Sequence, residues 1–204
     1  SQINPHFLFN TINTIASLIR TDPPKARELL REFAVFYRST IEHSQDQIRL
    51  ALELEQTLRY FSFEVARFGE DRLEINVDLE SKIENTSFNV AEMMVPPFLL
   101  QPIVENAVKH AMPAEGKLTI VISAQTEGSD VLISVTDDGV GMDRRACNNM
   151  MHSESSTGLG IAMKNVHDRM HGFFGSDADI LVATKPGEGT QVTLRFPKVL
   201  ETQG

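Results

Sequence analysis

One segment in the second half of the chain carries three side chains that together suit a hydrated metal ion and a polyphosphate. Glu105, Asn106 and Lys109 are close in sequence, so on a helix they project into the same or neighbouring quadrants. They offer a carboxylate, an amide oxygen and an ammonium group, which are suitable partners for a hydrated Mg²⁺ ion and for phosphates. Taken alone, the segment is more simply a solvated helix face.

A second segment, Asp137-Asp138-Gly139-Val140-Gly141-Met142, follows directly after an expected strand. A buried carboxylate at a strand end can accept a hydrogen bond from an exocyclic amine such as that of adenine. Two glycines allow the backbone to approach a flat ligand closely. Taken alone, Asp-Gly also favours an ordinary hairpin turn.

Two further glycine-containing segments follow in the chain. Gly158-Leu159-Gly160 precedes an expected helix, where unpaired N–H groups could hold phosphate. The spacing matches neither the dinucleotide fingerprint nor the Walker loop. Gly187-Glu188-Gly189-Thr190 is, taken alone, a hairpin turn.

A histidine near the N-terminus could act as a nucleophile. Leu8, Ile12, Ile15 and Ile19 form an apolar seam at 4-3-4 spacing, and His6 lies roughly 150° away from the mean direction of that seam. Asn10 follows His6 at i+4 and shares its polar face. Neutral imidazole, whose ordinary pKa is about 6.5, is a good nucleophile at physiological pH.

The order of the four segments resembles the N, G1, G2 and GT boxes of the ATPase superfamily that includes histidine kinases, Hsp90, gyrase B and MutL. The resemblance covers about residues 97–197 and implies a Bergerat-type pocket for ATP and Mg²⁺. It implies that Asp137 binds the adenine amine, that Asn106 binds Mg²⁺ and that Lys109 touches phosphate. The other expected nucleotide-binding residues are His110, Gly139, Gly141, Gly158, Gly160 and Thr190, and residues 142–157 would form a lid over ATP.

The N-terminal segment is more specific. Gln2-Ile3-Asn4-Pro5-His6-Phe7-Leu8-Phe9-Asn10 resembles the phosphoacceptor motif of LytS-type sensor histidine kinases, and residues 96–107 are similar to the N box of that family. Glu64-Val65-Ala66-Arg67-Phe68 also resembles a family element, although its role does not follow from the residues. The resemblance implies a homodimer that phosphorylates His6 with ATP and passes the phosphoryl group to an aspartate of a response regulator.

The chain departs from many histidine kinases at the residue after the histidine. Many carry an acid there, whereas this chain has Phe7, so the usual base is absent. We interpret Glu105 as a candidate substitute. Asn10 occupies the position at which other histidine kinases place a residue that positions water for phosphatase action, and we predict that it supports dephosphorylation of the regulator.

The length, net charge and cysteine count of the chain limit the classes of function that it can have. The chain has 204 residues and a formal net charge of -9, which argues against nucleic acid as a partner. Its single cysteine excludes an intrachain disulfide. No apolar run is long enough to cross a bilayer. Because the sequence opens at Ser1 within an expected helix, we expect the cytoplasmic portion of a bacterial inner-membrane protein, anchored only through a preceding sensor region.

The periodicities predict how these residues are positioned. Residues 1–45 form two amphipathic helices in a hairpin, which would pair into a dimeric four-helix bundle; residues 46–69 form a connecting helix; residues 70–204 form the ATP-binding domain. In that domain we expect strands over 73–79, 117–125, 130–136, 179–184 and 190–197, and helices over 97–111 and 160–173. The fold class is α+β, an α/β sandwich with a mixed sheet and helices on one face.

Two alternatives remain open. One is an ATPase of the same fold that hydrolyses ATP without phosphorylating histidine, against which the helices carrying His6 argue. The other is a degenerate kinase that acts as a dimeric scaffold, against which the four intact segments argue.

Overall fold

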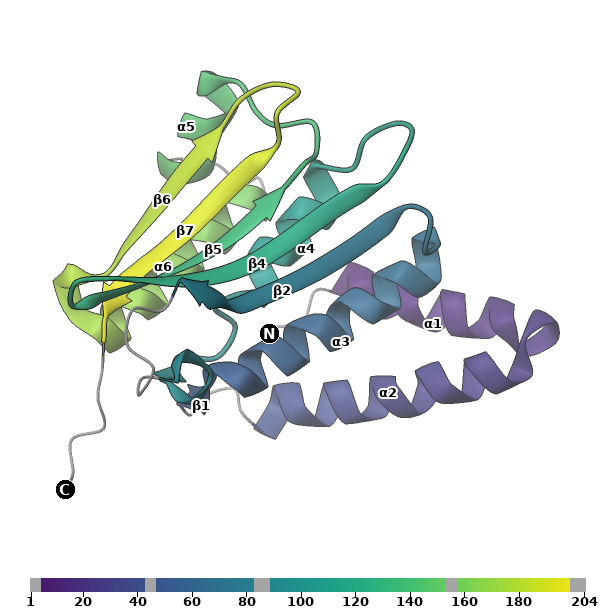
Figure 1. Ribbon diagram of the computed structural model, residues 1–204. Helices are drawn as coiled ribbons and strands as arrows, with labels where there is room; N and C mark the ends of the chain where they lie inside the picture. Colours follow the sequence, from purple (N-terminus) through teal and green to yellow (C-terminus); the bar gives the residue numbers. More distant parts are fainter. Residues whose placement is uncertain (1–4, 43–46, 83–88, 153–157, 199–204) are drawn as a thin grey trace.

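The computed structural model describes residues 5–42, 47–82, 89–152 and 158–198, which form a helical layer packed beside a sheet with its own helices (Figure 1). The α-helices are α1 (Pro5–Thr21), α2 (Pro23–Glu42), α3 (Leu50–Phe68), α4 (Gln101–His110), α5 (Arg144–His152) and α6 (Gly158–Phe174). The strands are β1 (Ile48–Arg49), β2 (Leu73–Lys82), β3 (Met94–Val95), β4 (Leu118–Glu127), β5 (Asp130–Asp137), β6 (Asp179–Thr184) and β7 (Thr190–Pro197). Two 3-10 turns, η1 (Val90–Glu92) and η2 (Gly175–Asp177), complete these elements.

The first two helices form the expected antiparallel hairpin, and α3 packs against both of them. An aromatic cluster joins the three helices. The ring of Phe7 in α1 lies 5.7 Å from Phe36 in α2 and 4.9 Å from Tyr60 in α3, and Phe63 in α3 lies 5.9 Å from Phe7 (centroid distances). Phe7 is therefore committed to the core, which fixes the adjacent His6 on the outer side of α1.

The predicted seam of α1 is wrong for the single chain. The buried residues of α1 are Phe7, Thr11 and Ile15, whereas Ile12 and Ile19 are exposed. By helical geometry the buried face is rotated about 70° from the predicted one. The aromatic cluster outweighs the aliphatic periodicity because burying a phenyl ring removes more apolar surface from water.

The main sheet is mixed, as predicted, with the order β2-β4-β5-β7-β6. β2 runs parallel to β4, and the other neighbours are antiparallel. Helices α4 and α6 cover one face (Figure 1). Fully buried residues of β4, β5 and β7, including Ile120, Ile133 and Leu194, supply the sheet side of this core.

The connection between the helical layer and the sheet domain centres on a buried carboxylate. Glu53 of α3 is 1% exposed. Its Oε1 accepts hydrogen bonds from the backbone N–H groups of Leu99 (2.7 Å) and Leu100 (2.8 Å), and its Oε2 accepts one from Phe98 (2.9 Å). A longer bond comes from Gln101 N–H. Glu53 thus caps the N-terminus of α4, where N–H groups have no partner within the helix.

Several local features differ from the sequence-based expectation. The five predicted strands are confirmed, and the connecting helix expected over residues 46–69 is the shorter Leu50–Phe68, preceded by strand β1. Residues 97–100 are not helical, because α4 begins only at Gln101. The short β1–β3 sheet and helix α5 were not predicted. Among the described helices, none combines the length and apolarity needed to span a membrane.

Candidate functional site

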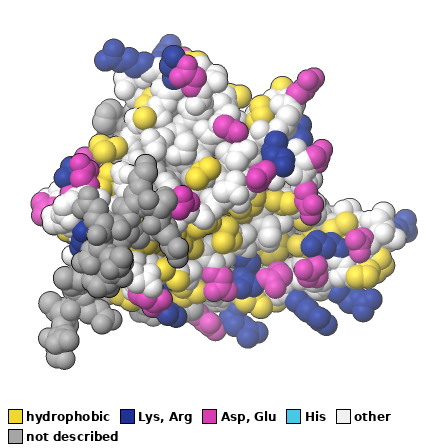
Figure 2. Space-filling view, in the orientation of Figure 1, with side chains coloured by type: hydrophobic (Ala, Val, Ile, Leu, Met, Phe, Trp, Pro, Cys, Tyr) yellow, Lys and Arg dark blue, Asp and Glu magenta, His cyan; other side chains and the backbone are white. Residues whose placement is uncertain are grey.

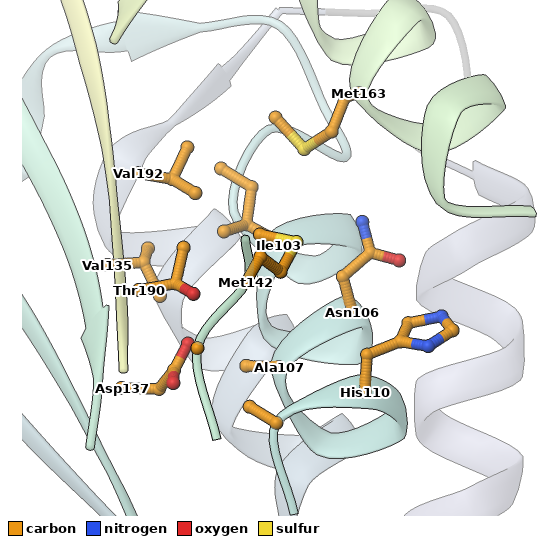
Figure 3. A pocket seen from close by; sticks show the side chains of 12 residues that line it. Ile103, Asn106, Ala107, His110, Val135, Asp137, Met142, Met163, Thr190 and Val192 are labelled. Atoms are coloured by element: carbon orange, nitrogen blue, oxygen red, sulfur yellow. The ribbon is translucent and has the colours of Figure 1, made fainter. Parts of the chain in front are cut away.

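A cavity of about 480 Å³, counting space open to solvent, lies between the sheet and helices α4 and α6 (Figure 3). Asp137 points into it from the end of β5, and Asn106 and His110 reach it from α4. Most of the lining is apolar. The lining residues are Ile103, Asn106, Ala107, His110, Ala111, Val135, Asp137, Gly141, Met142, Met163, Thr190 and Val192.

Asp137 is the buried acid of this cavity, at 7% exposure. Its Oδ1 accepts a hydrogen bond from Gly139 N–H at 3.0 Å. Burial raises the pKa of Asp137 and the nearby Asp138 adds to the rise, while backbone hydrogen bonds from Gly139 and Thr190 oppose it. The sequence-based expectation of a buried carboxylate at a strand end is confirmed.

The glycines around Asp137 serve backbone packing. A Cβ on Gly139 would lie closer than 3.0 Å to the carbonyl oxygen of Ala111 at the end of α4, and one on Gly141 would meet the carbonyl of Lys185 equally closely. Gly141 also has a φ of 62°. The sequence suggested close approach to a ligand, whereas the structure shows close approach of one loop to α4 and to the β6–β7 hairpin.

Thr184 fastens that loop to the hairpin. Its Oγ1 accepts a hydrogen bond from Met142 N–H at 2.9 Å and lies 3.1 Å from the carbonyl oxygen of Gly189. Gly187 N–H also donates to the carbonyl oxygen of Val140 at 2.8 Å. The segment 187–190, an ordinary turn by sequence, therefore holds the loop after β5 in place.

The α4 side of the cavity carries two polar groups. The Asn106 amide Nδ2 is buried and has no hydrogen-bond partner among the described residues. A buried polar group in that state calls for a ligand or a water. Burial lowers the pKa of His110, with a smaller contribution from Lys109, which favours its neutral form.

A second cavity of about 1240 Å³, again counting space open to solvent, lies between α1, α3 and α4. It brings together His6 and Asn10 from α1, Glu64 from α3, and Glu105 and Lys109 from α4. Asn106 lines this cavity as well as the first one. Lys109, expected beside phosphate, lines only the second of these two cavities.

His6 is exposed and its ring is held by its neighbour one turn along. Asn10 Nδ2 lies 3.0 Å from His6 Nδ1. This contact confirms that the two side chains share one face of α1. Glu105, by contrast, accepts a hydrogen bond from Gln101 Nε2 at 2.8 Å, and burial raises its pKa.

The remaining predicted residues lie at the edge of the first cavity. Gly158 and Gly160 form the first turn of α6, so the helix begins earlier than expected. Met142, the first residue of the expected lid, lines the cavity. Helix α5 occupies residues 144–152 of that segment, and residues 153–157 lie outside the described part of the chain.

Comparison with known families follows the division into helical layer and sheet domain. Residues 98–200 match the family of histidine kinase-, DNA gyrase B- and HSP90-like ATPases, and residues 1–73 match the histidine kinase family. The chain belongs to the histidine kinase-, DNA gyrase B- and HSP90-like ATPase family. Membership in this ATPase family implies that the sheet domain binds ATP.

Curated relatives support the same assignment. The chain is 38% identical to the sensor protein LytS of Staphylococcus saprophyticus and 35% identical to LytS of Bacillus subtilis. It is 33% identical to the sensor histidine kinase BtsS of Escherichia coli. Each match covers 97% of this chain but about a third (32%) of the relative. The predicted resemblance to the kinase portion of LytS-type sensor histidine kinases is confirmed.

Solved structures agree in fold. The histidine kinase domain of the Erythrobacter litoralis EL346 blue-light activated histidine kinase superposes with a TM-score of 0.52 at 18% identity, covering 96% of each chain. Acinetobacter baumannii histidine kinase AdeS gives a TM-score of 0.53 at 15% identity, covering 91% of this chain and 84% of that one. The predicted fold class is therefore confirmed.

Sequence reasoning did not single out Thr184 and assigned no role to Glu64. Thr184 has no distinctive sequence context, and only the folded hairpin reveals its contacts. Glu64 did carry a signal, since it is a carboxylate on the buried face of α3. It is 4% exposed and lines the cavity that holds His6.

Proposed function

We propose that this chain is an ATP-dependent protein-histidine kinase that phosphorylates His6 and passes the phosphoryl group to an aspartate of a response regulator. One observation carries the proposal: Asn106 lines both the cavity that contains Asp137 and the cavity that contains His6. A nucleotide whose base lies at Asp137 would thus direct its phosphates past Asn106 toward the histidine.

The first cavity suits an adenine ring. Its lining combines apolar side chains with one buried acid, as is typical of sites that bind small molecules. Asp137 would accept a hydrogen bond from the exocyclic amine. Gly139, Gly141 and Thr190 would shape the base pocket, His110 would line its α4 side, and Gly158 and Gly160 would offer backbone N–H groups to phosphate.

The α4 residues suit Mg²⁺ and phosphate. The Asn106 amide, whose nitrogen has no partner among the described residues, would place its oxygen on the metal after a rotation about its last side-chain bond. No cluster of three acidic, histidine or cysteine side chains exists in the described ranges, so phosphate oxygens would complete the coordination. Mg²⁺ bound there would screen phosphate charge, and Lys109 would contribute to the same screening.

The side chains around His6 suit phosphoryl transfer. Phe7 anchors the backbone through the aromatic cluster, and Asn10 holds the imidazole ring. Glu105, the candidate base suggested by the sequence, lines the same cavity, and so does Glu64. Asn10 is placed to support dephosphorylation of the regulator, since it would lie beside any phosphoryl group exchanged with His6.

The surface of the helical hairpin suits a second copy of the chain. Ile12 and Ile19 of α1 and Leu30 and Ile41 of α2 are exposed apolar residues, and Figure 2 shows hydrophobic side chains among charged ones over the helical layer. We infer that two hairpins pair into a four-helix bundle that covers them. The longer protein would be anchored in a bacterial inner membrane through a preceding region, with this portion in the cytoplasm.

A labelling experiment tests the proposal. The chain is incubated with γ-labelled ATP and Mg²⁺, and acid-labile, alkali-stable label is expected on the wild type and absent from His6→Ala. Persistence of the label in His6→Ala would refute His6 as the acceptor. Asp137→Asn should abolish ATP binding while the fold stays intact, and unchanged affinity would refute the adenine assignment.

The same experiment separates the alternatives. ATP hydrolysis without acid-labile label would indicate an ATPase that does not phosphorylate histidine. Absence of ATP binding by the wild type would indicate a dimeric scaffold.

A further inference from the structure

The cavity that contains His6 holds two carboxylates from different helices. Glu64 comes from α3 and Glu105 from α4. Phe7, which follows His6, is buried in the aromatic cluster. A negative charge for His6 must therefore come from another element, and these two residues are the acids that line its cavity.

Glu64 is held rigidly at the inner wall of this cavity. Its Oε1 accepts a hydrogen bond from the Tyr60 hydroxyl at 3.3 Å, and its Oε2 accepts one from Arg67 at 3.3 Å. The Tyr60 ring also packs on Phe7 at a centroid distance of 4.9 Å. Phe7, the neighbour of His6 in the chain, thus packs on Tyr60, which donates a hydrogen bond to Glu64. Tyr60 therefore links the position of Glu64 to that of His6.

Glu105 is placed differently. Its Oε1 is held by Gln101, one turn earlier in α4, and it also lines a cavity between α4 and α6 to which His6 does not belong. The charges that act on Glu105 are those of Glu64 and Lys109. Glu64, in contrast, lies within electrostatic reach of His6.

We propose that Glu64, rather than Glu105, is the positioning residue that orients His6 and balances the charge of its ring during phosphorylation. This inference rests on the proposed kinase function. A His6 ring nitrogen forms a bond to the γ-phosphorus while the bond to the ADP oxygen breaks and its electron pair leaves with ADP. The proton on the other ring nitrogen passes across the cavity to the Glu64 carboxylate, which leaves a neutral phosphorylated ring.

The protonation behaviour of Glu64 agrees with this role. Burial raises its pKa, and the opposing influences of Arg67, Tyr60 and His6 are smaller. A raised carboxyl pKa lies nearer to neutral pH, where a base works best. The titratable and charged groups that face Glu64 in this cavity are His6 from α1, Tyr60 and Arg67 from α3, and Glu105 and Lys109 from α4.

The test compares Glu64→Gln with Glu105→Gln in single-turnover labelling with γ-labelled ATP and Mg²⁺. We expect Glu64→Gln to slow His6 labelling by about 100-fold, with ATP affinity unchanged, and Glu64→Asp to restore part of the rate. Glu105→Gln should slow labelling less than about threefold. The wild-type rate should rise with pH along an acid limb to which Glu64 and His6 both contribute, whereas Glu64→Gln should keep only the contribution of His6.

Stability separates this role from a structural one. Because the folded-state pKa of Glu64 is raised, its stabilising contribution is present below pH 4.5 and is lost as pH rises through that pKa. A neutral glutamine keeps that contribution, so Glu64→Gln should unfold at the same temperature as the wild type or higher at neutral pH. Slower labelling in a chain of undiminished stability is the expected pair of results.

Three outcomes would overturn the inference. Wild-type labelling rates in Glu64→Gln, or a larger loss in Glu105→Gln, would contradict it while leaving the kinase function intact. Absence of label on wild-type His6 would overturn both together. If Glu64→Gln does not fold, Arg67→Gln serves instead: Arg67 lowers the pKa of Glu64, so its removal should move the acid limb to higher pH, and an unmoved limb would overturn the inference.

Discussion

The two cavities that share Asn106 are built in different ways. The cavity at Asp137 is held by backbone packed on backbone, at Gly139, Gly141 and Gly189, where a Cβ would meet a carbonyl group closer than 3.0 Å. The cavity at His6 is held by side chains, through the aromatic cluster and the Tyr60–Glu64 hydrogen bond. A substitution at one of these glycines would displace the backbone of the first cavity. A substitution of a side chain in the second cavity can change its chemistry while the backbone stays in place.

This contrast suits a nucleotide site joined to a reactive group. A constant ligand is bound best by a site with few accessible arrangements. A phosphoacceptor histidine, as proposed for His6, would have to be reached by ATP and then by a second protein, and the exposed helix face of His6 suits that role.

The largest effect concerns whether the two cavities of one chain work together. Because His6 and Asn106 line the same cavity within a single chain, we expect phosphorylation within one chain. Dimers that contain one His6→Ala chain and one Asp137→Asn chain should carry no label, since neither chain has both an acceptor and a nucleotide. Purification through two different affinity tags ensures that only mixed dimers are assayed. Label on the Asp137→Asn chain would show that the reaction occurs between chains.

The next prediction uses two glycines of one hairpin. Gly187 and Gly189 both have a φ of 79°, but only a Cβ on Gly189 would meet backbone, at the carbonyl of Asp137. Gly187→Ala should cost about 1–2 kcal/mol for the left-handed conformation alone. Gly189→Ala should in addition displace Asp137 and weaken ATP binding more than about tenfold, an expected change of at least 1.4 kcal/mol.

Calorimetric titration with ATP and thermal unfolding of both variants provide the measurement. Equal ATP affinities for the two variants would show that the hairpin does not hold Asp137 in place.

A third prediction concerns Glu53, which connects the helical layer to the sheet domain. Glu53→Ala removes the acceptor for the N–H groups that begin α4, and buried donors without partners cost about 1–3 kcal/mol each. We expect a loss of about 3 kcal/mol and a fall in Tm of roughly 6–12 °C. The exposed Glu55 on the same helix provides the control, since Glu55→Ala removes only a surface ion pair with Arg59 and should cost less than about 1 kcal/mol.

The pH dependence of this loss has a defined sign. Burial raises the pKa of Glu53 above its usual 4.5 despite the backbone hydrogen bonds. Its contribution to stability is therefore complete below pH 4.5 and declines as pH rises through the folded-state pKa. The deficit of Glu53→Ala should be largest at acid pH. A deficit that grows toward alkaline pH would show that the hydrogen bonds outweigh burial.

Sequence patterns predicted the helices and strands better than the contacts between them. Strand alternation located the five strands of the main sheet because each has one face on a buried core. Periodicity also identified α1 as amphipathic, but it could not distinguish apolar residues that pack within the chain, such as Phe7, from those left exposed, such as Ile12 and Ile19. That distinction depends on which helices lie beside α1.

The buried carboxylates of α3 were a signal that went unused. Glu53 and Glu64 are eleven residues apart and so about 20° apart around the helix, on the face that also carries Leu54 and Phe61. Acids on an apolar face require partners. The partner of Glu53, the start of α4, is 45 residues or more away in sequence and could not be predicted from spacing. Tyr60 and Arg67, the partners of Glu64, lie four residues before it and three after it, which is contact spacing on a helix.

The smallest expected effect belongs to Asn10, whose contact with the His6 ring is exposed to solvent. A hydrogen bond of this kind contributes about 0.5–1.5 kcal/mol, so Asn10→Ala should slow labelling of His6 by about two- to tenfold. If Asn10 also positions water, the same variant should lose dephosphorylation of the phosphorylated regulator almost completely. Asn13→Ala is the matched control, since Asn13 is exposed on the same helix and does not line the His6 cavity. Unchanged dephosphorylation in Asn10→Ala would restrict this residue to orienting the ring. Loss of dephosphorylation with near-normal labelling would instead assign the two opposing reactions to different residues around His6: dephosphorylation of the regulator to Asn10 on α1, and phosphorylation of His6 to Glu64 on α3.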